Sequence, residues 1–183
     1  MNFKRFFPKS TFNKNEGLDT FTQKWYGKHL LVMNEKPIYN SGSSDLTIYR
    51  LLYLRTFEHP VMIKITIEKN EILLRAIILS GAGGYEPGTV KTDIKRTLSE
   101  KDVQEIEKLI ENMDFWNLNT NKERLGLDGN QCIFEVYDKT NKYHVIDRWS
   151  PEFYKDDKEY VDLINHLLNL ANINVPELYD PRR

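Results

Sequence analysis

The chain has 183 residues, of which 40% are hydrophobic and 29% charged, and its formal net charge is −1. These values are those of an ordinary folded domain, and the absence of a basic excess argues against a nucleic-acid binder. A single cysteine, Cys132, excludes an internal disulfide and a cysteine-based zinc site. No segment approaches the roughly 18 apolar residues of a membrane span, and no apolar run typical of a secretory signal follows the N-terminus. We therefore expect a cytoplasmic protein without a membrane partner.

The N-terminal part of the chain contains one helix pattern. Residues 1–17 are polar, weakly basic and without periodicity, which predicts a flexible arm. Residues 18–33 repeat apolar side chains at helical spacing and predict an amphipathic helix. The residues on its apolar face are Leu18, Phe21, Trp25, Leu30 and Leu31.

Strand patterns follow a turn-rich connector. Residues 46–57 are apolar on both faces, as in a central strand, and residues 61–68 alternate strictly between apolar and polar. Lys69 and Asn70 form a two-residue reversal, after which residues 72–79 return as a third strand. A fourth strand is expected at residues 89–97, beyond a flexible, glycine-rich loop at 80–88.

The second half begins with a helix signal. Ser99 stands three positions before Asp102 at the start of an apolar stripe, which is typical of a capped helix start. Two strands joined by a tight reversal are expected between residues 131 and 149. A final helix is expected at 158–171, and an extended tail at 172–183.

The order of these elements predicts the fold class. The order α-β-β-β-β-α-β-β-α is that of an α+β protein with three helices and a largely antiparallel sheet of about six strands. A chain of this length supports one well-cored domain, whereas a division into two would leave each half marginal. We place that single domain at residues 18–171.

The hairpin at 131–149 contains the densest group of titratable residues. If Thr140 and Asn141 form its tip, alternation places Glu135, His144 and Arg148 on one polar face and Asp147 on the other, mostly apolar face. The opposed pairs are then Tyr137 with His144, Glu135 with Ile146, and Ile133 with Arg148.

Two interpretations of this polar face remain open. In the first, it lines a pocket, with Glu135 or His144 as a catalytic general base and Arg148 as a clamp that binds a carboxylate or phosphate. In the second, it carries a cross-strand ion pair beside a histidine and serves only the structure of the sheet.

The first strand and the glycine-rich loop contain further candidates. Arg50 and Arg55 lie on opposite faces of their strand, so at least one is covered and needs a carboxylate, for which Glu135 and Asp147 are candidates. The loop at 80–88 lacks the Gly-Lys-Ser/Thr ending of a phosphate-binding loop, and Tyr85 is its candidate ligand-binding residue.

Metal and cofactor motifs are not found in the sequence. The segment Gly126–Gly129 predicts a tight turn, because its glycines permit positive φ and the Asp128 carboxylate holds loop amides. The four histidines lack the spacing of a metal site, so we expect no metal and no cofactor.

Several motifs resemble a family of uncharacterised bacterial proteins. They are YRLLYLRTFEHPVMIKI at 49–65, FW at 115–116, GLDG with a strand glutamate at 126–135, and YHVIDRWSP at 143–151. The resemblance covers most of the chain from Trp25 to Ala171. It implies a bacterial source and a single domain, and it indicates no biochemical activity.

Three functional hypotheses follow. Tyrosine, tryptophan and arginine, which make good interface anchors, are abundant, and no catalytic motif is found, so we favour a non-catalytic protein-interaction domain, of the small immunity or accessory type, with a protein partner. The alternative is a small-molecule-binding or hydrolase-like enzyme that uses Glu135, His144 and Arg148. The third, nucleic-acid binding through the N-terminal arm and the first strand, is disfavoured by the charge.

Overall fold

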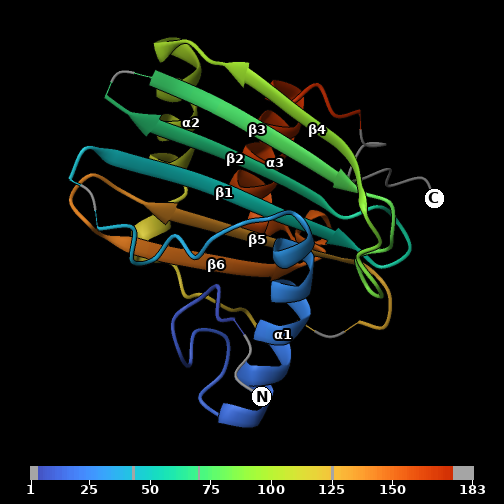
Figure 1. The fold of residues 1–183 in the computed structure, drawn as a ribbon. Helices are drawn as coiled ribbons and strands as arrows, with labels where there is room; N and C mark the ends of the chain where they lie inside the picture. Colours follow the sequence, from blue (N-terminus) through green and yellow to red (C-terminus); the bar gives the residue numbers. More distant parts are fainter. Residues whose placement is uncertain (1–3, 43, 70, 125, 175–183) are drawn as a thin grey trace.

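A six-stranded antiparallel sheet with helices on both faces organises the computed structural model, which describes residues 4–42, 44–69, 71–124 and 126–174 (Figure 1). The strands lie side by side in the order β4-β3-β2-β1-β5-β6, so the predicted α+β fold and the predicted element order are confirmed. The strands are β1 (Leu46–Arg55), β2 (Val61–Glu68), β3 (Glu71–Leu79), β4 (Val90–Thr97), β5 (Asn130–Tyr137) and β6 (Tyr143–Trp149). The helices are α1 (Glu16–Val32), α2 (Glu100–Asn112) and α3 (Lys158–Leu170), with short 3-10 turns η1 (Phe115–Asn117), η2 (Pro151–Phe153) and η3 (Lys155–Asp157).

Side-chain caps fix where the first two helices begin. The Asn15 side chain accepts hydrogen bonds from the first backbone amides of α1. Ser99 and Asp102 form the reciprocal capping box expected from the sequence, which satisfies amide groups that the first turn of α2 leaves unpaired. None of the helices in the described part of the chain is long and apolar enough to cross a membrane.

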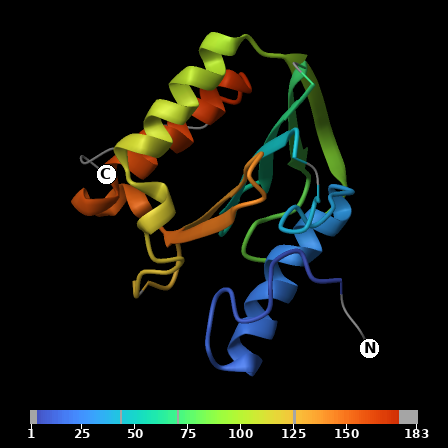
Figure 2. The ribbon, with the colours of Figure 1, turned by 90° about the vertical axis from the view of Figure 1, so that its left-hand side faces the viewer.

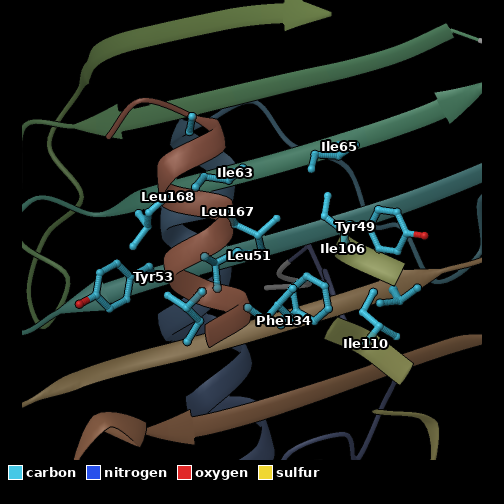
Figure 3. Packing of buried hydrophobic residues seen from close by; sticks show 14 of the residues in the cluster. Tyr49, Leu51, Tyr53, Ile63, Ile65, Ile106, Ile110, Phe134, Leu167 and Leu168 are labelled. Carbon is cyan, nitrogen blue, oxygen red and sulfur yellow. The ribbon is translucent and has the colours of Figure 1, made fainter. Parts of the chain in front are cut away.

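The larger hydrophobic core lies between the sheet and the helices α2 and α3. Seen along the sheet, both helices cover one face (Figure 2). Their apolar stripes meet the inward residues of the strands, as Leu167 on α3 and Ile106 on α2 do against Leu51 and Phe134 (Figure 3). Because α2 and α3 also contact each other, they form one continuous layer.

The opposite face of the sheet is covered by α1 and by residues 4–15. Phe6, Phe7 and Phe12 are buried there beside Tyr26 and Leu30 of α1. This packing differs from the flexible arm predicted for residues 1–17, because three phenylalanines bury enough apolar surface to hold a segment that has no helix or strand of its own. Most of the predicted tail, residues 175–183, lies outside the described residues, as does Asn70 of the predicted β2–β3 reversal.

The side of helix α1 that packs against the rest of the protein is not the side predicted from the sequence. Leu18, Phe21 and Leu31, which were predicted on its apolar face, are each more than half exposed. Its buried side instead contains Asp19 and Gln23. These side chains are needed inside because they bind the N-terminal segment: Asp19 accepts hydrogen bonds from the amides of Ser10 and Phe12, and Gln23 donates to the Pro8 carbonyl.

The register of the β5–β6 hairpin differs by one residue from the prediction. The Asp138 amide donates to the Lys142 carbonyl, and Asn141 adopts a left-handed conformation (φ 64°), so the hairpin closes around three residues. Tyr137 therefore pairs with Tyr143, and not with His144. Because strand side chains alternate, this single step exchanges the two faces of β6.

Candidate functional site

Glu135 lies on the α1 side of the sheet, in a fully buried ion pair with Arg50 of β1. The Arg50 Nε donates to Glu135 Oε2 at 2.7 Å, and both side chains are inaccessible to solvent. The Tyr143 hydroxyl donates to the other carboxylate oxygen at 2.8 Å. The prediction that a buried first-strand arginine pairs with Glu135 or Asp147 is thus confirmed for Arg50 and Glu135.

A second buried carboxylate, Glu35, extends this pair across the sheet. It comes from the connector after α1 and accepts two hydrogen bonds from the Lys64 Nζ, at 2.7 and 2.8 Å. Arg50 and Arg75 each lie 3.4 Å from it. Lys64 and Arg75 were not singled out as site residues, although they lie in register with Arg50 on adjacent strands.

The pKa shifts of Glu135 and Arg50 indicate that this group of buried charges has a structural role. Burial raises the pKa of the Glu135 carboxyl, and the adjacent Arg50 opposes that shift. Burial by itself lowers the pKa of Arg50, yet the two carboxylates outweigh it and the pKa of the guanidinium is raised. The charged state of Arg50 is therefore retained, and Glu135 is occupied by internal partners.

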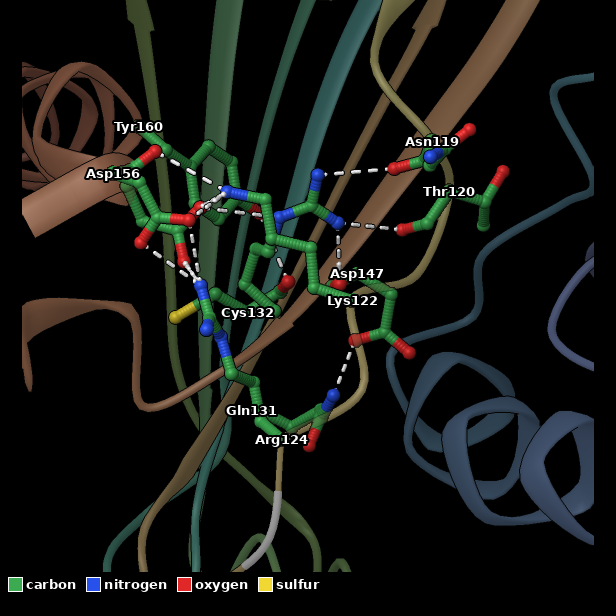
Figure 4. A network of polar contacts seen from close by, with 11 residues as sticks. Asn119, Thr120, Lys122, Arg124, Gln131, Cys132, Asp147, Asp156 and Tyr160 are labelled. Atoms are coloured by element: carbon green, nitrogen blue, oxygen red, sulfur yellow. Dashed lines mark hydrogen bonds and ion pairs between the residues drawn. The ribbon is translucent and has the colours of Figure 1, made fainter. Parts of the chain in front are cut away.

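Arg148 lies on the opposite face of the sheet, among loop carbonyls. Figure 4 shows two of these acceptor residues, Asn119 and Thr120, on their loop. Arg148 donates to the carbonyl oxygens of Asn119, Thr120 and Asp147 at 2.8 to 3.0 Å, and its Nε lies 3.4 Å from the Asp157 carboxylate. Its side chain is almost completely buried. A guanidinium with this many internal acceptors holds the 118–122 segment against β6 and has little capacity left for a ligand carboxylate or phosphate.

His144 and Asp147 also differ from their predicted positions. The ring of His144 packs edge-on against Phe115, and its Nε2 lies 2.9 Å from the Leu118 carbonyl. Burial lowers the pKa of His144. Asp147 shares the face of Glu135, where it accepts hydrogen bonds from the Tyr26 hydroxyl and from Gln131.

The three candidate catalytic residues consequently do not converge. Glu135 lies on one side of the sheet, while His144 and Arg148 lie on the other, because the hairpin register differs by one residue. The hairpin face that carries Glu135 is covered by α1 and its connector. Within residues 4–42, 44–69, 71–124 and 126–174, no group of three or more metal-binding side chains is found.

Tyr85, the candidate ligand-binding residue, lies at the end of the sheet where four loops meet. We call this surface the loop end, and it consists of residues 56–60, 80–88, 126–130 and 150–154 (Figure 1). Each loop exposes one bulky apolar side chain, and the exposed fractions lie between 56% and 100%. These side chains are Phe57, Tyr85, Leu127 and Phe153, of which Phe57 and Tyr85 have ring centroids 6.0 Å apart.

Backbone hydrogen bonds connect each of these loops to the next. The Gly83 amide donates to the carbonyls of Arg55 and Glu58 at 3.0 Å, and the Thr56 amide donates to the Gly129 carbonyl at 2.9 Å. Ser150 then pairs with Asn130, which joins the last loop. The loop end is thus a rigid surface, in contrast to the flexible loop expected at 80–88.

Two glycines are required by close packing in these loops. A Cβ at Gly83 would lie 2.6 to 2.7 Å from the backbone of Arg55, and a Cβ at Gly126 would overlap the Trp149 ring. Gly129 does not adopt the positive φ that the predicted turn permitted, and its lack of a side chain instead admits the close approach of Ser150 and Trp149. Asp128 is exposed, and its carboxylate makes no hydrogen bond within the described residues.

A hollow of about 380 Å³ lies at the opposite end of the sheet, between β1, β5 and the C-terminal end of α2. Its walls combine aromatic rings with carboxylates, a chemistry that suits an organic cation. Its aromatic and acidic lining residues are Tyr49, Phe115, Trp116, Glu107, Glu111, Asp114 and Asp138.

Tyr85 is the one exposed apolar side chain of the loop end that the sequence singled out. Phe57, Leu127 and Phe153 were missed, although each is a bulky apolar residue in a turn-rich segment. Phe57 precedes Pro60 by three positions, Leu127 follows Gly126, and Phe153 follows Ser150-Pro151 by two positions. A bulky apolar residue within three positions of such turn residues is the signal that could have found them, since turn-rich segments lie on the surface.

Comparison with known proteins adds no relative: no protein-family model matches the chain, and the search of curated proteins gives no match. The resemblance to a bacterial family therefore stays a prediction.

Proposed function

We propose that this chain is a protein-interaction domain that binds a partner protein through the loop end. The observation that carries the proposal is the concentration of Phe57, Tyr85, Leu127 and Phe153 on adjoining loops at one end of the sheet. Exposed apolar side chains gathered in one region are typical of interaction sites, whereas isolated ones are not. Aromatic residues are also the usual anchors of such interfaces.

The rigidity of the loops supports the same proposal. Loops that are already fixed by backbone hydrogen bonds lose little conformational entropy on binding. The hydrogen bonds of Gly83 and Thr56 hold the β1–β2, β3–β4 and pre-β5 loops in one arrangement. We extend the proposal to a cytoplasmic protein of the small bacterial immunity or accessory type, on the motifs between Tyr49 and Pro151 that resemble a bacterial family.

The alternative, a small-molecule-binding or hydrolase-like enzyme that uses Glu135, His144 and Arg148, has less support. Catalysis by these groups requires that they converge on one substrate. They lie on two faces of the sheet, and each already has internal hydrogen-bond partners. The interaction proposal needs no such convergence.

Affinity capture tests the proposal. The tagged wild-type protein, a Phe57→Ser/Tyr85→Ser variant and a Leu73→Ser control are incubated with a lysate of the cells that naturally make the protein. Leu73 is a matched control because it is exposed on β3, at the other end of that strand. We expect the wild type and the control to retain a stoichiometric partner that the double variant loses. Recovery of no such partner by the wild type, or equal recovery by the double variant, would contradict the proposal.

A further inference from the structure

Helix α1 exposes an apolar stripe that no described residue covers. Leu18, Phe21 and Leu31 are exposed on the outer half of the helix, where at 3.6 residues per turn they spread over about 140°. The opposite side of α1 holds Asp19, Gln23, Tyr26 and Leu30 against the protein. Helix α1 therefore buries some polar side chains and exposes some apolar ones, the reverse of an ordinary amphipathic helix.

Two hollows flank this stripe. One, of about 470 Å³, lies between Phe21 and Trp25 of the helix and Gly84 of the β3–β4 loop. The other, of about 150 Å³, includes Leu31 and the N-terminal Phe6. The first is large enough for a bulky side chain of another protein. We call this surface the α1 stripe, and it consists of the exposed Leu18, Phe21 and Leu31, the half-buried Trp25, and Lys24 and Lys28.

Positive charge surrounds both hollows. Lys24 and Lys28 line each of them, and Lys4 lines the smaller one. Residues 1–36 contain seven lysines or arginines against three acidic residues, in a chain whose net charge is −1. The Lys28 ammonium already holds one carboxylate, that of the exposed Glu86, at 3.0 Å. The α1 stripe therefore offers apolar hollows within a basic border.

We propose that the α1 stripe binds an acidic amphipathic segment of a partner protein. An apolar side chain of that segment enters the hollow between Phe21, Trp25 and Gly84, and its carboxylates pair with Lys24 and Lys28. This inference rests on the proposed function and names the chemistry of the partner. The stripe is continuous with the loop end, because the Trp25 Nε1 donates to the Gly83 carbonyl at 2.9 Å.

The shape of the stripe favours a protein over a lipid bilayer or a nucleic acid. Insertion into a bilayer uses a convex apolar face, whereas here Phe21, Trp25 and Leu31 line concave hollows. A phosphate backbone is bound by basic and polar groups, and it has no apolar group that would pack against Leu18 and Leu31. Side-chain knobs of an amphipathic segment match both the hollows and the lysines.

Selection of phage-displayed peptides against the folded full-length protein tests the inference. We expect the enriched peptides to place Asp or Glu beside bulky apolar residues at helical spacing. A synthetic representative is then measured by fluorescence polarisation. Phe21→Ser and the pair Lys24→Gln/Lys28→Gln should each weaken its binding by ~10-fold or more, and added salt should weaken binding to the wild type.

A control variant and three contrary outcomes sharpen this experiment. Leu73→Ser/Lys101→Gln removes one exposed apolar residue and one exposed lysine elsewhere, and it should bind the peptide as the wild type does. Enrichment of neutral or basic peptides, or of none, overturns the inference. So does binding that only Phe57→Ser/Tyr85→Ser weakens, an outcome that leaves the proposed function standing. Sedimentation of the wild type, but not of Phe21→Ser, with phosphatidylserine vesicles would assign the stripe to membranes instead.

Discussion

Two buried titratable side chains, His29 on α1 and Asp147 on β6, shift their pKa values in opposite directions. Burial lowers the pKa of His29 from 6.5 to about 4, and neither ring nitrogen has a hydrogen-bond partner within the described residues. The nearby Gly83 carbonyl opposes this shift without reaching hydrogen-bond geometry. Burial raises the pKa of Asp147 from 3.8 to about 6, against the hydrogen bonds from Gln131 and Tyr26.

These shifts act on stability with opposite signs in the same pH range. Between pH 6.5 and about 4, the unfolded chain binds a proton at His29 that the folded protein does not, so stability falls as the pH falls. Between about pH 6 and 3.8, the folded protein binds a proton at Asp147 that the unfolded chain does not, so stability rises as the pH falls. The two contributions partly cancel in the wild type.

Single substitutions should separate the two titrations. Relative to wild type, His29→Leu should become more stable on going from pH 6.5 to pH 4.5, and Asp147→Asn less stable, each by about 2 kcal/mol. Urea unfolding of the three proteins at both pH values measures the differences, in which the other titrating groups cancel. A His29→Leu variant whose stability changes with pH as that of the wild type does would show that His29 is not held neutral by burial.

Among the elements, the β3–β4 loop shows how the loop end is kept rigid. The Gly83 amide donates to two carbonyls of the β1–β2 turn, and the Gly84 amide donates to a third, that of Thr56. The position of Gly83 allows no side chain, because its neighbours are backbone atoms of Leu54 and Arg55, which cannot move aside. The geometry of Tyr85 thus depends on a glycine two positions earlier.

Gly83→Ala should therefore damage both stability and binding. We expect a loss of about 1–3 kcal/mol in the free energy of unfolding, as for overpacking of a filled site, and weaker capture of the partner. Gly17→Ala is the control, since Gly17 is exposed in the first turn of α1, where alanine is tolerated or stabilising by up to about 1 kcal/mol. Urea unfolding and the capture assay measure both effects, and equal behaviour of the two variants would refute the role given to Gly83.

The elements also show where sequence reasoning succeeds and where it stops. Strong local signals, such as the Ser99 cap of α2 and the alternation of residues 61–68, predict the element order and the fold class. The face of an element depends on tertiary partners: α1 turns Asp19 inward because that side chain binds distant amides. The register of the hairpin depends on a loop closed by the left-handed Asn141. An error of one residue in that register was enough to predict Glu135, His144 and Arg148 on one face.

At the scale of the whole molecule, the strands β1, β2 and β5 are buried on both faces of the sheet, and different elements cover the two faces. The α2 and α3 layer supplies regular apolar stripes on one face, whereas the other face depends on α1 and on an N-terminal segment without regular structure. That segment must be ordered to bury Phe6, Phe7 and Phe12, and the outer side of α1 is left exposed. The α1 stripe is thus a consequence of using the N-terminal residues as core.

Phe7→Ala tests whether the N-terminal segment is part of the core. The Phe7 ring is completely buried against Phe12 and Tyr26, so its removal should cost about 3–5 kcal/mol of unfolding free energy. Phe21→Ala, at a phenylalanine that is 69% exposed, should change it by no more than about 0.5 kcal/mol. Urea denaturation of both variants decides the matter. If the segment were a loose arm, the two substitutions would have equally small effects, and α1 would lack the support that holds its apolar stripe toward solvent.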